Sequence, residues 1–225
     1  MRVQYLQQLQ NLQDDLLVMG SMVMQALGDA LHALKNQDLD AARQVVAGDR
    51  EINTRRFQIE EECLVLIATQ QPMARDIRLI ASILEIAGEL ERIGDYGKGI
   101  GKITLYIGKK PPLKPLIHMP LMCEKVIEML RAALDAFINQ DLQAARAIPT
   151  RDDEVDELYN LINRELIDLI VANRAMTDHA NYLSWAAHNL ERAADRVTNI
   201  CERVIYTVTG EFLEMDVEKG VTTWS

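Results

Sequence analysis

The stretch ELERIGDYGKGI at residues 89–100 returns in altered form as NLERAADRVTNI at residues 189–200. Both stretches keep the order Leu, Glu, Arg and then, three residues after the Arg, Asp. Each therefore places two carboxylates four residues apart, Glu91 with Asp95 and Glu191 with Asp195. This recurrence indicates that a longer unit of the chain is duplicated.

The duplication extends well beyond this phrase. ALHALKNQDLDAAR at 30–43 matches ALDAFINQDLQAAR at 133–146 in ten of fourteen positions. A unit of roughly a hundred residues is too long for a solenoid repeat, so we expect two similar domains. The predicted domains are 1–107 and 121–209, with a Pro-rich linker at 108–120 and an extended or disordered tail at 210–225.

Composition and periodicity together predict an all-α fold. Aromatic residues make up only 5% of the chain, and residues that favour helices predominate. Apolar residues from Tyr5 to Leu34 recur every three or four positions, which is the period of one helix face. We predict two tandem, pseudo-symmetric three-helix bundles with six long helices. Those helices are expected at about 5–34, 39–70, 72–106, 121–139, 141–173 and 176–209, with Asp38 and either Thr177 or Asp178 as N-caps and Pro72 in a first turn.

The charge of the chain limits its partners. A net charge of −10 argues against nucleic acid, because such binding neutralises phosphates with clustered Lys and Arg. We find no signal sequence and no apolar run of membrane-spanning length, so we expect a cytoplasmic protein that reaches the membrane only through partners. Cys63, Cys123 and Cys201 lie far apart among apolar residues and are expected to be reduced thiols in the core.

The acidic pairs are the candidate functional residues. Residues four apart share one face of a helix, so each pair directs two carboxylates to the same side. A second pair precedes the first in each copy: Asp152 with Asp156, and its counterpart Asp49 with Asn53. Oxygen ligands from two neighbouring helices suit hard cations. We therefore predict one metal site per copy, and the weaker site in the first copy, where Asn53 brings no charge.

Simpler interpretations of the same residues stay open. Acidic pairs at this spacing also occur on ordinary solvated faces, and only the duplication favours a metal site. Arg92 and Arg192 could pair with the carboxylates or cover apolar surface with their stems. His188 could join the second site or lie on the surface. Iron, zinc, manganese and magnesium cannot be ranked from these ligands.

Nothing in the sequence indicates catalysis. No His follows a Glu at the spacing used by di-iron bundles, and no cysteine has a base at recognisable spacing. The glycines of GDYGKGIGK form neither a dinucleotide fingerprint nor a P-loop, and predict close helix packing or a local bend instead.

With these motifs in hand, the chain resembles the PhoU family, the regulators that accompany bacterial high-affinity phosphate transporters. The resemblance runs from LLVMG (16–20) through QQPMARDIRLI (70–80) and LERIGDYGKGI to NLERAADRVTNICERVIYTVTGE (189–211). It implies two tandem three-helix bundles whose E/D-x-x-x-D motifs bind metal ions. In this chain those motifs fall on Glu91/Asp95, Glu191/Asp195 and Asp152/Asp156, whereas Asp49/Asn53 departs from the motif.

The resemblance also implies a function. It points to a negative regulator of the phosphate-starvation response that contacts the phosphate ABC transporter, on its ATPase side, and a sensor histidine kinase. We also expect a homodimer or a higher homo-oligomer. The alternatives are an accessory protein of an ion-coupled phosphate permease and, from a different class, a metal-dependent helical-bundle hydrolase or oxidase.

Overall fold

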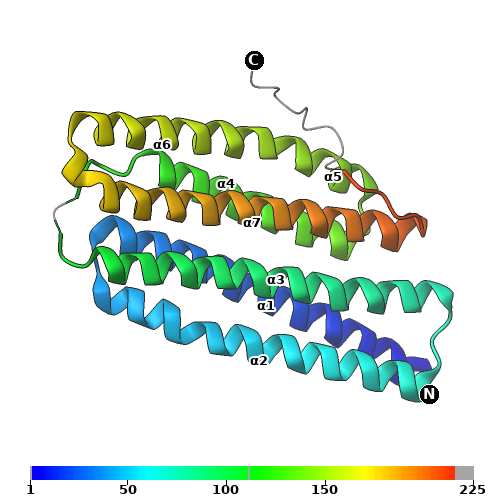
Figure 1. Cartoon of the computed structure of the whole chain (residues 1–225). Helices are drawn as coiled ribbons and strands as arrows, with labels where there is room; N and C mark the ends of the chain where they lie inside the picture. The colour runs from blue at the N-terminus through cyan, green and yellow to red at the C-terminus, as the bar shows by residue number, and fades with distance from the viewer. Residues whose placement is uncertain (1, 111, 216–225) are drawn as a thin grey trace.

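The computed structural model describes residues 2–110 and 112–215, and within these ranges it contains helices and no strands (Figure 1). The all-α prediction is therefore confirmed. The first repeat supplies α1 (Arg2–Asn36), α2 (Leu39–Gln70) and α3 (Ala74–Ile107). The second repeat supplies α4 (His118–Asn139), α5 (Leu142–Ala147), α6 (Asp152–Ala172) and α7 (Thr177–Thr209), with short 3-10 turns η1 (Ile148–Arg151) and η2 (Arg174–Met176). α4 begins inside the segment predicted as linker.

Local sequence signals explain several helix ends. Asp38 caps α2, since its carboxylate accepts hydrogen bonds from two backbone N–H groups of the first turn, as predicted. Asp141, its counterpart in the second repeat, caps α5 in the same way. The prediction for the last helix is wrong, because neither Thr177 nor Asp178 caps it. Asn173 instead accepts from the N–H of Ala175 and caps the 3-10 turn before α7.

Two further departures from the predicted helices involve segments that contain a proline. The helix predicted at 141–173 is interrupted by the 3-10 turn η1, which contains Pro149. Proline lacks the N–H needed for the α-helical ladder, and its ring crowds the carbonyl four residues earlier, so the helix breaks there. Pro72 lies before α3 rather than in its first turn, because α3 begins only at Ala74.

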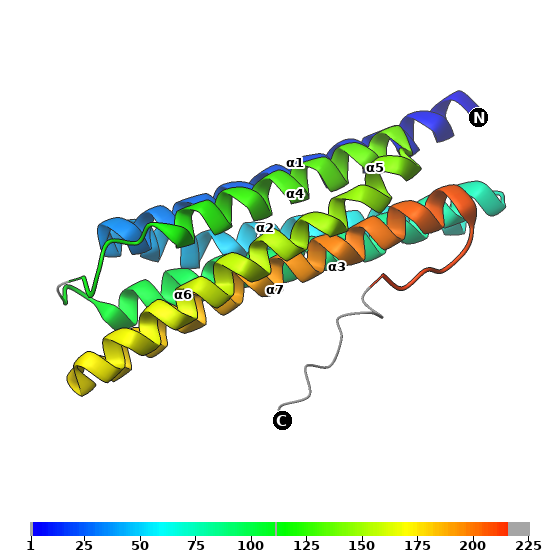
Figure 2. The same ribbon diagram turned by 90° about the horizontal axis from the view of Figure 1, so that it is seen from above.

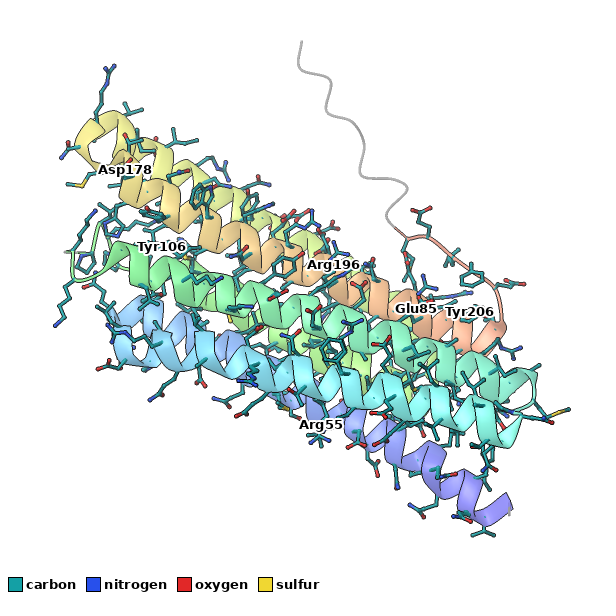
Figure 3. All side chains as sticks on the ribbon, turned by 60° about the horizontal axis from the view of Figure 1, so that its bottom comes forward. Arg55, Glu85, Tyr106, Asp178, Arg196 and Tyr206 are labelled. Carbon is teal, nitrogen blue, oxygen red and sulfur yellow. The ribbon has the colours of Figure 1, made fainter. Side chains whose placement is uncertain are left out.

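The two bundles pack against one another over a single continuous core. From top to bottom, the front of Figure 1 shows α6, α7, α3 and α2. The view from above in Figure 2 shows that α1 and α4 lie side by side on the far side of the molecule from α6 and α7. α3 and α7 are antiparallel neighbours: Ser82 Oγ lies 2.7 Å from Thr207 Oγ1, and the rings of Tyr106 and Tyr182 lie 5.9 Å apart. Tyr106 and its repeat counterpart Tyr206 consequently lie at opposite ends of the molecule (Figure 3).

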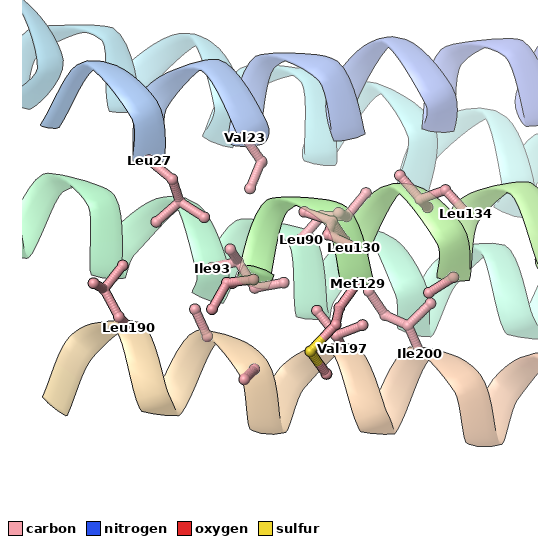
Figure 4. Close-up of a cluster of buried hydrophobic side chains, with 14 of the residues drawn as sticks. Val23, Leu27, Leu90, Ile93, Met129, Leu130, Leu134, Leu190, Val197 and Ile200 are labelled. Carbon is pink, nitrogen blue, oxygen red and sulfur yellow. The ribbon is translucent and has the colours of Figure 1, made fainter. Parts of the chain in front are cut away.

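Side chains from both repeats fill the centre of this core. Figure 4 shows residues of α1, α3, α4 and α7 meeting there. The labelled members are all at most 2% exposed: Val23, Leu27, Leu90, Ile93, Met129, Leu130, Leu134, Leu190, Val197 and Ile200. A glycine on α3 permits close approach of α2, since a Cβ on Gly101 would lie 3.2 Å from the carbonyl oxygen of Ala42, closer than an ordinary van der Waals contact. The predicted close packing of the glycine-rich segment is confirmed.

One helix has the composition of a membrane span. Over Val3–Asn36 the best 18-residue window has a mean hydropathy of 1.3, so this helix is long and apolar enough to cross a membrane by length and composition alone. The burial of its apolar stripe explains the composition, because Leu12, Leu16 and Met19 are at most 2% exposed against the other helices. A helix that packs against several others in a protein core can reach this mean hydropathy.

The described part of the tail, 210–215, is not helical and turns back along α7. Gly210 takes the left-handed conformation that ends the helix, with φ 80°. Phe212 then stacks on Tyr206 at 4.2 Å, and the N–H of Met215 donates to Glu202. The rest of the predicted tail, 216–225, lies outside the described residues.

Candidate metal centres

The fold gathers the eight predicted site residues into two groups, one in each repeat. In the first repeat, Asp49 and Asn53 on α2 face Glu91 and Asp95 on the adjacent α3. In the second repeat, α6 and α7 supply the equivalent positions, and Asp152, Asp156 and Asp195 act electrostatically on Glu191. The predicted convergence of helix two and helix three in each bundle is therefore found in the structure.

The first group contains a cation that the sequence analysis missed. Lys98 Nζ donates to Asp49 Oδ2 at 2.6 Å and to Asp95 Oδ1 at 3.1 Å, which joins α2 to α3. Asn53 Nδ2 donates to the same Asp49 oxygen at 3.0 Å. The sequence does contain a signal for this cation. The first copy of the repeated phrase has Lys98 at the position where the second copy has Thr198.

Opposing charges act on the pKa of Glu91 in the first group. Partial burial and the charge of Asp95 raise its pKa, while the guanidinium groups of Arg56 and Arg92 oppose that shift. Lys98 itself has a raised pKa, mainly because of its hydrogen bond to Asp49. The first group is thus largely neutralised by basic side chains of the same repeat.

The second group contains four carboxylates, one more than the first. Burial, followed by the charges of Asp195 and Asp156, raises the pKa of Glu191 to about 7. Its Oε2 is buried and accepts no hydrogen bond from any described residue. The ring of His188 nevertheless lies beside it, with Nδ1 at 3.2 Å, so His188 belongs to this group.

The two groups differ in how well they suit a metal ion. Within residues 2–110 and 112–215 no three His, Cys, Asp or Glu side chains converge closely enough to hold one as they stand. The second group has a fitting donor set, with four carboxylates that include the buried Glu191 oxygen to which no described residue donates. The first group does not fit, because Lys98 already bridges Asp49 and Asp95.

A family model matches the chain at both repeats. The model of the PhoU domain covers residues 16–104 and again residues 119–204. The chain belongs to the PhoU family. The two matched segments correspond to the two bundles, and each contains one of the acidic groups.

Individual PhoU proteins align with almost the whole chain. It is 34% identical over 207 residues to the phosphate-specific transport system accessory protein PhoU homolog of Aquifex aeolicus (strain VF5), covering 92% of this chain and 94% of that protein. It is 36% identical to the homolog of Caulobacter vibrioides (strain NA1000 / CB15N), with 93% and 91% covered. The crystal structure of the phosphate transport system regulatory protein PhoU from Streptococcus pneumoniae matches with a TM-score of 0.86 at 29% identity, over 94% of this chain and all of that one.

The arginines of the two repeated Leu-Glu-Arg stretches, Arg92 and Arg192, do not act as buried partners of the carboxylates in the two acidic groups. Arg92 is 57% exposed and pairs with Glu89 on its own helix, and Arg192 is 41% exposed, 3.8 Å from Asp195. Other arginines join the repeats across the α3–α7 junction. The side chain of Arg196 (Figure 3) is only 17% exposed and lies 3.5 Å from Glu89, and Arg203 lies 2.8 Å from Glu85. Sequence spacing could not reveal the contact between Arg196 and Glu89, since 107 positions separate the two residues.

The cysteines of this PhoU chain are unsuited to nucleophilic chemistry. Cys63, Cys123 and Cys201 are all buried and free, as predicted. Burial raises the pKa of each thiol to about 12, so the reactive thiolate is scarce at neutral pH.

Proposed function

We propose that this chain is a phosphate-transport accessory protein that represses the phosphate-starvation response and modulates high-affinity phosphate uptake. It would act in the cytoplasm as a metal-binding adaptor between the phosphate ABC transporter and a sensor histidine kinase. The observation that carries this proposal is the match of both repeats to the PhoU domain, together with 34–36% identity to phosphate-specific transport system accessory proteins over most of the chain.

Surface features support action by contact rather than by catalysis. Tyr106, Tyr182 and Trp185 form an aromatic cluster that spans the two bundles, with ring centroids 5.9 Å and 5.7 Å apart. Tyr106 is 62% exposed and Trp185 is 51% exposed. Aromatic residues are enriched at the centres of protein interfaces, because they bury a large area at low entropic cost.

Binding measurements with purified proteins test the adaptor role. We expect the chain to bind the ATPase subunit of the phosphate transporter and the cytoplasmic part of the kinase saturably in biolayer interferometry. Trp185→Ala should weaken at least one of these interactions by about tenfold, which is about 1.4 kcal/mol. Val171→Ala removes an apolar side chain that is 79% exposed elsewhere on the surface and serves as the control. Failure to bind either protein would contradict the proposal.

Metal binding is the second testable part of the proposal. Because the second group has four carboxylates and the first has a resident lysine, we expect Asp195→Asn to weaken Mn²⁺ binding by about tenfold or more, and Asp95→Asn to change it little. Titration calorimetry on the parent and the two variants gives the comparison. Equal losses in the two variants, or a parent protein that binds no metal, would contradict it.

A further inference from the structure

We propose that Lys98 is the resident cation of the first acidic group and occupies the position that a metal ion would take in the second group. The comparison with the second group rests on the metal binding proposed above. The assignment of Lys98 itself depends only on contacts within the first repeat.

The contacts of Lys98 are those expected of a bridging cation. Its Nζ lies 2.6 Å from Asp49 and 3.1 Å from Asp95, so one ammonium group holds carboxylates from two helices. Asp49 is only 6% exposed, and burying a carboxylate is costly unless a positive charge or hydrogen bonds compensate for the lost water. Both roles, bridging carboxylates and neutralising buried charge, are those of a bound metal ion.

Three substitutions between the repeats all make the first group less negative. Asn53 stands where the second repeat has Asp156, and Lys98 stands where it has Thr198. Arg56, whose charge acts on Glu91, stands where the second repeat has Tyr159. The first copy therefore combines three carboxylates with Lys98 and Arg56, whereas the second copy has four carboxylates and neither of these basic residues.

Lys98 also opposes metal binding directly. Its ammonium group already occupies one oxygen of Asp49 and one of Asp95, the two carboxylates that approach each other from α2 and α3. Asn53 directs its amide N–H toward the same Asp49 oxygen at 3.0 Å, and an N–H cannot ligate a cation. Asp49 Oδ1 accepts no hydrogen bond from the described residues, but an ion reaching it would lie next to the ammonium and be repelled.

Mn²⁺ titrations followed by electron paramagnetic resonance test this assignment in the full chain. The background variant is Glu191→Gln with Asp195→Asn, which disables the second group. We expect this background to bind no Mn²⁺ in the first repeat, and to remain without Mn²⁺ when Asn53→Asp adds a carboxylate beside Lys98. Adding both Asn53→Asp and Lys98→Thr should create one Mn²⁺ site, with affinity at least tenfold above any residual Mn²⁺ binding of the background.

Thermal unfolding tests the assignment even if the variant that combines Asn53→Asp with Lys98→Thr folds poorly. Lys98→Met leaves Asp49 buried without its cation, so we expect it to lower the Tm by on the order of 10 °C. Lys102→Met, at an exposed position one turn further along α3, should change the Tm by less than about 2 °C.

Three results would overturn the assignment. They are Mn²⁺ binding in the first repeat of the background variant, a folded combined variant that still binds no Mn²⁺, and equal Tm values for Lys98→Met and Lys102→Met. Absence of Mn²⁺ from the second group of the parent protein would instead contradict the proposed metal-binding function and leave the expected Lys98 results unchanged.

Discussion

Replacing Glu191 with Gln is expected to stabilise the folded protein above neutral pH by on the order of 3 kcal/mol. The pKa of Glu191 is raised from 4.5 to about 7 by burial and by neighbouring carboxylates. The folded state therefore holds a proton that the unfolded chain has released, and the parent protein loses stability as the pH rises from about 4.5 to 7. Gln cannot ionise, so the variant avoids this loss, and a change of one in pKa corresponds to about 1.4 kcal/mol.

Denaturant unfolding at several pH values measures this effect. In metal-free buffer we expect the parent and Glu191→Gln to have nearly equal free energies of unfolding at pH 4.5 and to diverge up to pH 8. Glu157→Gln, at an exposed position on α6, should show no such divergence. A gap between parent and Glu191→Gln that is constant with pH would show that Glu191 does not titrate as described.

Deleting the gene is expected to leave phosphate-starvation genes fully induced even when phosphate is plentiful, because the adaptor that represses them is missing. Glu191→Ala with Asp195→Ala should reproduce part of this induction, as far as loss of the second group weakens docking to the transporter or the kinase. A reporter under starvation control gives the measurement. Removing two mutually repelling carboxylates should not lower the amount of folded protein, which immunoblotting of the same cultures would check.

A matched control variant shows whether the loss of repression comes from the second acidic group or from the loss of any two negative charges. Asp153→Ala with Glu157→Ala removes an exposed acidic pair at the same spacing on α6, and we expect normal repression. If the Glu191/Asp195 variant is folded and metal-free yet represses normally, the second group is structural and the regulatory surface lies elsewhere. Turnover of a phosphate ester or a redox substrate by the purified protein would contradict the adaptor role itself.

The sequence by itself determined the helices, the duplication and the acidic pairs at i, i+4. The helices and pairs depend on residues a few positions apart, and the duplication is visible when the two halves of the sequence are compared. The spacing of apolar residues set the buried face of α1, and Asp38 formed its cap from atoms within three residues. The i, i+4 spacing was enough to place Glu191 and Asp195 on one face of α7. The local predictions failed at Pro149, which interrupts the helix predicted at 141–173, and at Thr177 and Asp178, neither of which caps α7.

The tertiary structure alone decided the electrostatics of each site. Lys98 and Asp49 are 49 positions apart, and only the packing of α2 against α3 brings the ammonium to the carboxylate. In the same way, the antiparallel packing of α3 on α7 pairs Arg196 with Glu89. The physical reason is that charge interactions and desolvation depend on distance and burial in three dimensions, whereas helix formation depends on residues a few positions apart. Two copies of one phrase could therefore become a lysine-bridged group and a group with a partly protonated Glu191.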